Sequence, residues 1–121
     1  MDNETLEIER GGWAAFAEDF SKQHGGETAT LESIGADDGD QYPAENLPFV
    51  GMTLESKGSA VGSLIVMLGT EGAEHIERLI AAPKSLRVHV SPGGETTLEI
   101  EADDEPTLLL HLQTPKELPA P

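Results

Sequence analysis

Residues 86–112, LRVHVSPGGETTLEIEADDEPTLLLHL, predict three short β-strands joined by two turns. Apolar residues take alternate positions in each of three segments, and this period of two is typical of strands with one buried face. These residues are Leu86, Val88 and Val90, then Leu98 and Ile100, then Leu108, Leu110 and Leu112. Glycine and proline at 92–94, and acidic residues with proline at 103–106, are typical of turns. The stretch therefore predicts an antiparallel meander.

The opposite face of this meander gathers the residues that could carry chemistry. Alternation places Arg87, His89, Glu99, Glu101 and His111 on it. We expect Arg87 to face Glu99 across the first turn and Glu99 to face His111 across the second, as cross-strand charge pairs worth about 0.2–1 kcal/mol each. The first interpretation is a solvated face whose charges neutralise one another. The alternative is a divalent-metal site formed by His89, His111 and either Glu99 or Glu101, although Arg87 would repel a cation.

Three segments upstream of the meander predict further strands. Residues 52–56 alternate apolar and polar side chains. Residues 61–68 are apolar on both alternations, which predicts a strand covered on both faces and central in the sheet. Residues 73–82 fit a helix, through apolar residues three and four apart, and also a strand, through Ile76 and Ile80 on one face. We expect a strand there.

The N-terminal segment changes from a strand period to a helix period. Leu6 and Ile8 alternate with Glu7 and Glu9, which predicts a short, half-buried strand. Apolar and aromatic residues then recur three and four positions apart, as on one face of an amphipathic helix. They are Trp13, Phe16, Ala17, Phe20 and His24, and glycines at 25 and 26 end the run. We expect this aromatic face to cover one face of the sheet.

The segment 35–48 is predicted to be an acidic loop. Its aspartates Asp37, Asp38 and Asp40 cluster the oxygen ligands that calcium prefers. The positions after Asp40, however, lack the further oxygen ligand and the glycine that an EF-hand loop requires. We therefore interpret the segment as an acidic turn, and these three aspartates together with Arg87 as candidate interaction residues.

The length of 121 residues fits one domain, which we place at 1–114, with a proline-rich tail at 115–121 that we expect to be mobile. The predicted fold class is α+β: a mainly antiparallel, twisted or barrel-like sheet of six to seven strands with one N-terminal amphipathic helix. The chain has no cysteine, which excludes disulfides and thiolate metal sites.

Charge restricts the partners. Seven lysines and arginines oppose 23 aspartates and glutamates, for a formal net charge of −16. The basic residues are scattered singly, so we expect no direct binding to nucleic acid or to a membrane surface. The longest apolar run, 64–68, is too short for a membrane helix, and no signal-peptide pattern is visible, so we expect a cytoplasmic protein.

Two interpretations of the acidity remain open. Acidic surfaces keep proteins soluble at high salt, where their self-repulsion is screened, which would suit a halophilic source. The other interpretation is functional, because an acidic surface can dock a basic protein or imitate the phosphates of a nucleic acid.

No catalytic motif is present in the sequence. We find no nucleophile elbow, phosphate-binding loop, dinucleotide fingerprint or His-Glu-x-x-His helix. We therefore expect no enzyme and no cofactor, and favour a non-enzymatic protein-interaction or accessory module. One alternative is small-molecule or divalent-metal binding on the face that carries His89 and His111. The other is an acidic nucleic-acid mimic that binds a basic protein.

Three groups of residues resemble a known family. They are Arg10-x-x-Trp13-x-x-Phe16-x-x-x-Phe20-Ser21-x-x-His24-x-Gly26, then Leu47-Pro48-x-x-Gly51-Met52, then Ala82-Pro83 before the acidic hairpins. Together they are similar to a small prokaryotic family catalogued as a domain of unknown function. The resemblance implies a fold, with a strand before Pro83, and implies no activity, ligand or catalytic residue.

Overall fold

The computed structural model describes residues 4–35, 39–56, 58, 61–70, 72–103 and 105–113, which form an antiparallel sheet and one α-helix. The helix α1 spans Trp13–His24 and follows a 3-10 turn at Arg10–Gly12. The strands are β1 (Glu4–Ile8), β2 (Thr28–Gly35), β3 (Gly39–Leu54), β4 (Leu64–Gly69), β5 (His75–Ile80), β6 (Pro83–Val90), β7 (Thr96–Ala102) and β8 (Thr107–Gln113). Their spatial order is β1-β6-β7-β8-β2-β3-β4-β5. The predicted α+β class is confirmed.

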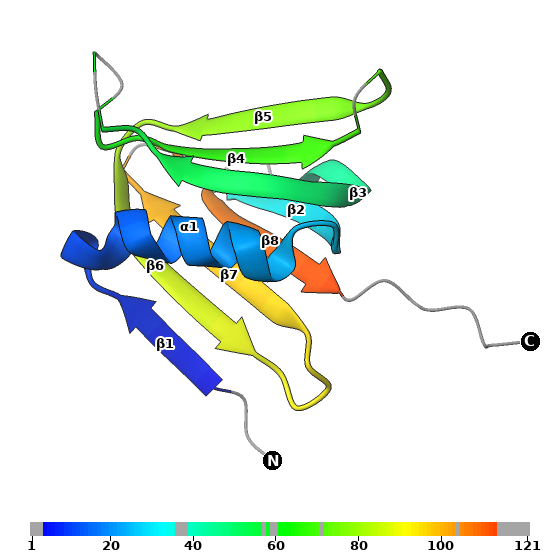
Figure 1. The fold of residues 1–121 in the computed structure, drawn as a ribbon, viewed down its shortest axis with the longest axis horizontal. Helices are drawn as coiled ribbons and strands as arrows, with labels where there is room; N and C mark the ends of the chain where they lie inside the picture. Colours follow the sequence, from blue (N-terminus) through cyan, green and yellow to red (C-terminus); the bar gives the residue numbers. More distant parts are fainter. Residues whose placement is uncertain are drawn as a thin grey trace, which may run out of the picture.

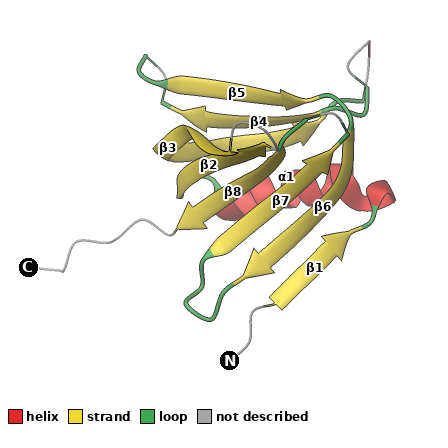
Figure 2. Cartoon of the chain, turned by 180° about the vertical axis from the view of Figure 1, so that it is seen from behind, coloured by secondary structure: helices red, strands yellow, loops and turns green. Residues whose placement is uncertain are grey.

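The helix lies across one face of a strongly twisted sheet (Figure 1). Seen from behind, β6, β7 and β8 stand in front of the helix (Figure 2). The sheet therefore has an inner face, which packs against α1, and an outer face, which points away from it. Along each strand, alternate side chains belong to one face or the other.

The described residues form eight strands, so the prediction of six to seven was wrong. Both edge strands of the observed sheet were among the strands expected from the sequence. The five-residue N-terminal strand β1 pairs with β6, and the strand β5 pairs with β4. The expectation of a strand within 73–82 is thus confirmed. Both edge segments have only partly buried or exposed side chains apart from Ile80, which weakens their sequence signal.

The expected acidic loop at 35–48 was also wrong, because residues 39–48 belong to the long strand β3. Two irregularities in its pairing with β2 explain the missed strand. Pro43 lies in one of them, where the ladder requires no N–H donor. Asn46 lies in the other, with φ of 55°. Each irregularity breaks the period of two on which a sequence-based strand prediction depends.

The sequence predicted that the apolar strand β4 would be central, and this was wrong. Strand β4 lies next to the edge strand β5. Leu64, Val66 and Leu68 are buried, and the residues between them are half-buried. An apolar run on both alternations indicates that both faces are covered. It carries no information on how many strands lie to either side.

Helix α1 packs mainly on β3. Trp13, Ala17 and Phe20 are buried, and the Phe20 ring meets the ring of Phe49 edge-on at 5.7 Å between centroids. The Ser21 hydroxyl accepts a hydrogen bond from the Met52 amide at 2.8 Å. A side chain at residue 51 would place its Cβ 3.3 Å from the Ser21 hydroxyl, so glycine at this position permits the close approach of helix and strand.

The inner face of the predicted meander is confirmed, except at its end. Leu86, Leu98, Ile100, Leu108, Leu110 and Leu112 are buried in the core. Val90, predicted to point inward, is 36% exposed. The proline-rich residues 115–121, and Asp37 and Asp38 with them, lie outside the described residues.

Candidate functional site

A row of charged side chains crosses the outer face from β1 to β2. We call it the polar row; it consists of Glu7, Arg87, His89, Glu99, Glu101, His111 and Glu32. Arg87 is shared by three carboxylates: it lies 3.1 Å from Glu7, 3.5 Å from Glu99 and in contact with Glu101. The predicted pairing of Arg87 with Glu99 is confirmed. The hydrogen bond from Arg87 lowers the pKa of Glu101, and the same bond raises the pKa of Arg87.

Two histidine–carboxylate pairs extend this row. His89 Nε2 lies 2.8 Å from Glu99 Oε1, and His111 Nε2 lies 2.8 Å from Glu32 Oε1. Because an ionised carboxylate only accepts hydrogen bonds, Nε2 carries a proton in both imidazoles. The other ring nitrogen of His89 lies 2.9 Å from the Thr5 hydroxyl. Each imidazole is thus oriented by its neighbours on the sheet.

The expected pairing of Glu99 with His111 was wrong. In the ladder between β7 and β8, His111 stands opposite Thr97, and Glu99 stands opposite Leu109. His111 reaches across to Glu32 on β2 instead. The register differs from the predicted one by two residues, and such a shift keeps every side chain on its own face. Alternation alone therefore cannot choose between the two registers.

The row ends beside β3, where Asp40 lies next to Glu32. Glu32 raises the pKa of Asp40, because its carboxylate favours a protonated Asp40 as hydrogen-bond partner and repels an ionised one. The pKa of Glu32 is lowered, chiefly by its hydrogen bond with His111. Of the predicted interaction aspartates, Asp40 thus joins the end of the polar row.

The charged side chains of the polar row pair with one another and do not converge on a common point where a ligand could bind. Within the described residues, no three histidine or carboxylate side chains are grouped as a metal ion requires. His89 and His111 each have a carboxylate of their own. The metal site proposed from His89, His111, Glu99 and Glu101 stays a hypothesis that the geometry does not favour.

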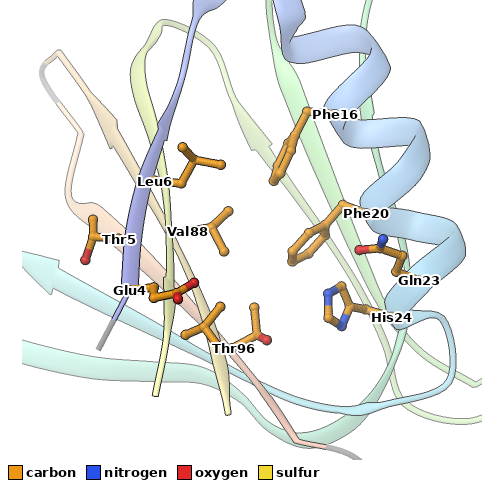
Figure 3. A pocket seen from close by; sticks show the side chains of 10 residues that line it. Glu4, Thr5, Leu6, Phe16, Phe20, Gln23, His24, Val88 and Thr96 are labelled. Carbon is orange, nitrogen blue, oxygen red and sulfur yellow. The ribbon is translucent and has the colours of Figure 1, made fainter. Parts of the chain in front are cut away.

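A groove of about 660 Å³ opens on the inner face, between α1 and the β1–β6 end of the sheet. We call it the α1–β1 groove. Phe16 and Phe20 point from the helix toward Leu6 and Val88 on the strands (Figure 3). Leu6 is 64% exposed, the largest value among the exposed large apolar side chains of the described residues. The walls of the groove are therefore largely apolar and open to solvent.

Polar groups gather at one end of the α1–β1 groove. Glu4, Thr96, Gln23 and His24 line this end (Figure 3). His24 Nδ1 lies 3.0 Å from Glu27 Oε1, so a carboxylate already holds this imidazole. The groove thus combines an apolar floor with a polar end, which is the usual composition of a binding site.

The groove exists because α1 covers only part of the inner face. The buried side chains of α1 pack on β3, while β1 and β6 extend beyond the helix (Figure 1). The sequence placed Leu6, Val88 and Val90 on the inner face correctly, but Leu6 and Val90, which it predicted to be covered, are exposed. No sequence signal could have found the groove, since it depends on where the helix crosses the sheet.

The comparisons with known proteins identify a family and no function. A family model described as a family of unknown function, DUF5335, matches residues 4–121. The chain belongs to the DUF5335 family. No curated protein and no solved structure gives a significant match to this DUF5335 chain. The suspected domain of unknown function is thereby confirmed. Within the described residues, no helix has the length and apolar character of a membrane span.

The residues by which the chain resembles the DUF5335 family have two roles in the structure. Trp13, Ser21 and Gly51 fix α1 on the sheet: the Trp13 indole donates to the Ile8 carbonyl at 2.9 Å, and Ser21 meets the backbone beside Gly51. Phe16 and His24, in contrast, line the α1–β1 groove. The family-like helix therefore both anchors the fold and forms one wall of the α1–β1 groove.

Proposed function

We propose that this DUF5335 chain is a non-enzymatic protein-interaction module that binds a segment of a partner protein in the α1–β1 groove. The observation that carries the proposal is the 64% exposed Leu6 in an apolar groove at the free edge of the sheet. Covering that leucine would contribute roughly 1–2 kcal/mol to binding, since full burial of a leucine is worth about 1.5–3 kcal/mol. Exposed apolar patches bordered by polar residues mark interaction sites.

The arrangement of titratable groups supports a binding role over catalysis. The two histidine–carboxylate pairs belong to the polar row, on the outer face, whereas the groove lies on the inner face. A general base acts within hydrogen-bond reach of a bound substrate, so it needs to share the cavity with it. The imidazole that does line the groove, His24, is held by Glu27.

Peptide selection on the intact chain tests this proposal. Random-sequence peptides are panned on wild type, on Leu6→Asp and on Leu79→Asp. Leu79 is a matched control, because it is a 48% exposed leucine on the opposite edge strand, β5. We expect peptides that bind wild type and Leu79→Asp alike and bind Leu6→Asp at least tenfold more weakly. The proposal is wrong if no peptide is enriched, or if the enriched peptides ignore Leu6→Asp.

A further inference from the structure

We propose, resting on the proposed function, that the partner segment is an extended strand with alternating basic and apolar residues, which adds to the free edge of β1. Within the described residues, β1 is the first strand of the sheet and is paired on one side only, with β6. A free edge offers backbone N–H and C=O groups to an incoming strand.

The β1 edge lacks three of the features by which proteins block strand addition, namely proline, lysine and a bulge. Its sequence, ETLEI, contains no proline and no lysine, and its pairing with β6 runs without a bulge. The opposite edge, β5, is charged as well, with Glu77 and Arg78, but it lies away from the α1–β1 groove. The groove therefore favours β1 as the docking edge.

The two faces of β1 determine which side chains an added strand needs. Leu6 stands opposite Val88 and faces the groove, whereas Glu7 stands opposite Arg87 and faces the polar row. An added strand continues the same alternation. Its residue beside Leu6 points into the groove and is apolar, and its residue beside Glu7 points to the outer face.

Charge selects a basic residue at that second position. Glu7 lies at the exposed end of a cluster in which Arg87 also contacts Glu99 and Glu101. The three carboxylates and the one guanidinium of this cluster carry a net charge of −2. Glu4 adds a carboxylate at the polar end of the groove. The whole chain carries −16, which attracts a basic segment and repels a second copy of the chain.

The length of the added strand is limited at one end. The Ile8 carbonyl accepts the hydrogen bond from the Trp13 indole, so helix α1 closes the edge after Ile8. The available edge spans the five residues Glu4–Ile8. We expect an interface at the small end of the known range and a Kd on the order of micromolar.

Synthetic peptides separate strand addition from the other modes of binding. The test peptide is Lys-Val-Lys-Val-Lys-Val with blocked ends. A block peptide of the same composition, Lys-Lys-Lys-Val-Val-Val, removes the alternation, and an N-methylated copy removes the backbone donors at alternate residues. A basic amphipathic helix and the acidic peptide Glu-Val-Glu-Val-Glu-Val complete the set. Binding is measured by fluorescence anisotropy, and strand pairing by hydrogen exchange of the β1 amides.

We expect the alternating basic peptide to bind and to slow exchange at alternate β1 amides. Leu6→Asp and Glu7→Lys should each weaken it at least tenfold, while the matched β5 variants Leu79→Asp and Glu77→Lys should not. The near-UV circular dichroism signal of buried Trp13 verifies that each variant is folded.

Several outcomes overturn this inference. Equal binding of the block or N-methylated peptide would mean that charge, not strand pairing, holds the ligand. Preferential binding of the helical or acidic peptide, with sensitivity to Leu6→Asp, removes the strand inference and leaves the proposed function standing. A dimer in sedimentation that Leu6→Asp dissociates would identify a second copy as the occupant. Failure of every peptide, selected or designed, removes both proposals.

Discussion

Replacing Leu6 by alanine should change stability very little, although leucine-to-alanine changes are among the costliest in protein cores. Leu6 is 64% exposed, so only about a third of its side chain is covered by the fold. Since full burial of a leucine is worth about 1.5–3 kcal/mol, the covered part is worth roughly 0.5–1 kcal/mol, and truncation to alanine removes less than that. The matched variant Leu98→Ala removes a side chain with 0% exposure and should cost about 2–5 kcal/mol.

Urea denaturation followed by Trp13 fluorescence measures both costs as free energies of unfolding. The two variants make the same chemical change on strands of one sheet, so their difference reports coverage by the fold. A loss of about 2 kcal/mol or more in Leu6→Ala, approaching that of a core leucine, would refute the reasoning, because the α1–β1 groove would then be closed in solution. A small loss combined with weakened peptide binding identifies Leu6 as a residue kept for binding.

Three further predictions concern the fold and its charges. Gly69→Ala should lower the free energy of unfolding by more than about 2 kcal/mol in the same denaturation assay, because Gly69 has φ of 121° and an added Cβ would lie 2.2 Å from the Glu74 carbonyl oxygen. A loss of stability within experimental error would contradict the geometry of this turn. Glu101→Gln should lower the unfolding midpoint at neutral pH, because Arg87 lowers the pKa of Glu101 in the folded protein and so stabilises the fold when Glu101 is ionised. The difference from wild type should shrink as pH falls below the ordinary glutamate pKa of 4.5, since acid protonates Glu101. A difference independent of pH would argue against the ion pair. Added sodium chloride should raise the thermal midpoint of the wild type continuously, because a net charge of −16 repels itself and salt screens it; a flat or falling midpoint would mean that the repulsion is already compensated.

The sequence predicted the parts of the fold that depend on local periodicity. The alternation around Leu98 and Leu110 assigned both faces of the meander, and the spacing of Trp13, Phe16 and Phe20 assigned the helix. These patterns are reliable because a strand turns its side chains by half a rotation per residue and a helix by about 100°.

What the sequence could not predict depends on relations between elements. The register between β7 and β8 differs by two residues from the predicted one. His111 therefore pairs with Glu32 instead of Glu99, although it lies on the predicted face. The irregularities at Pro43 and Asn46 hid a strand inside an apparent loop. The α1–β1 groove needed the crossing position of the helix, which no local pattern contains.

The central claim, that the α1–β1 groove binds a partner segment, is tested most directly by nuclear magnetic resonance. A peptide selected on the wild-type chain is titrated into isotope-labelled protein, and shifts of backbone amides and leucine methyl groups are recorded. We predict shifts along β1 and at Phe16 and Phe20, with contacts between the peptide and the Leu6 methyl groups. Shifts confined to the polar row or to β5, with the Leu6 signals unmoved, would contradict the claim.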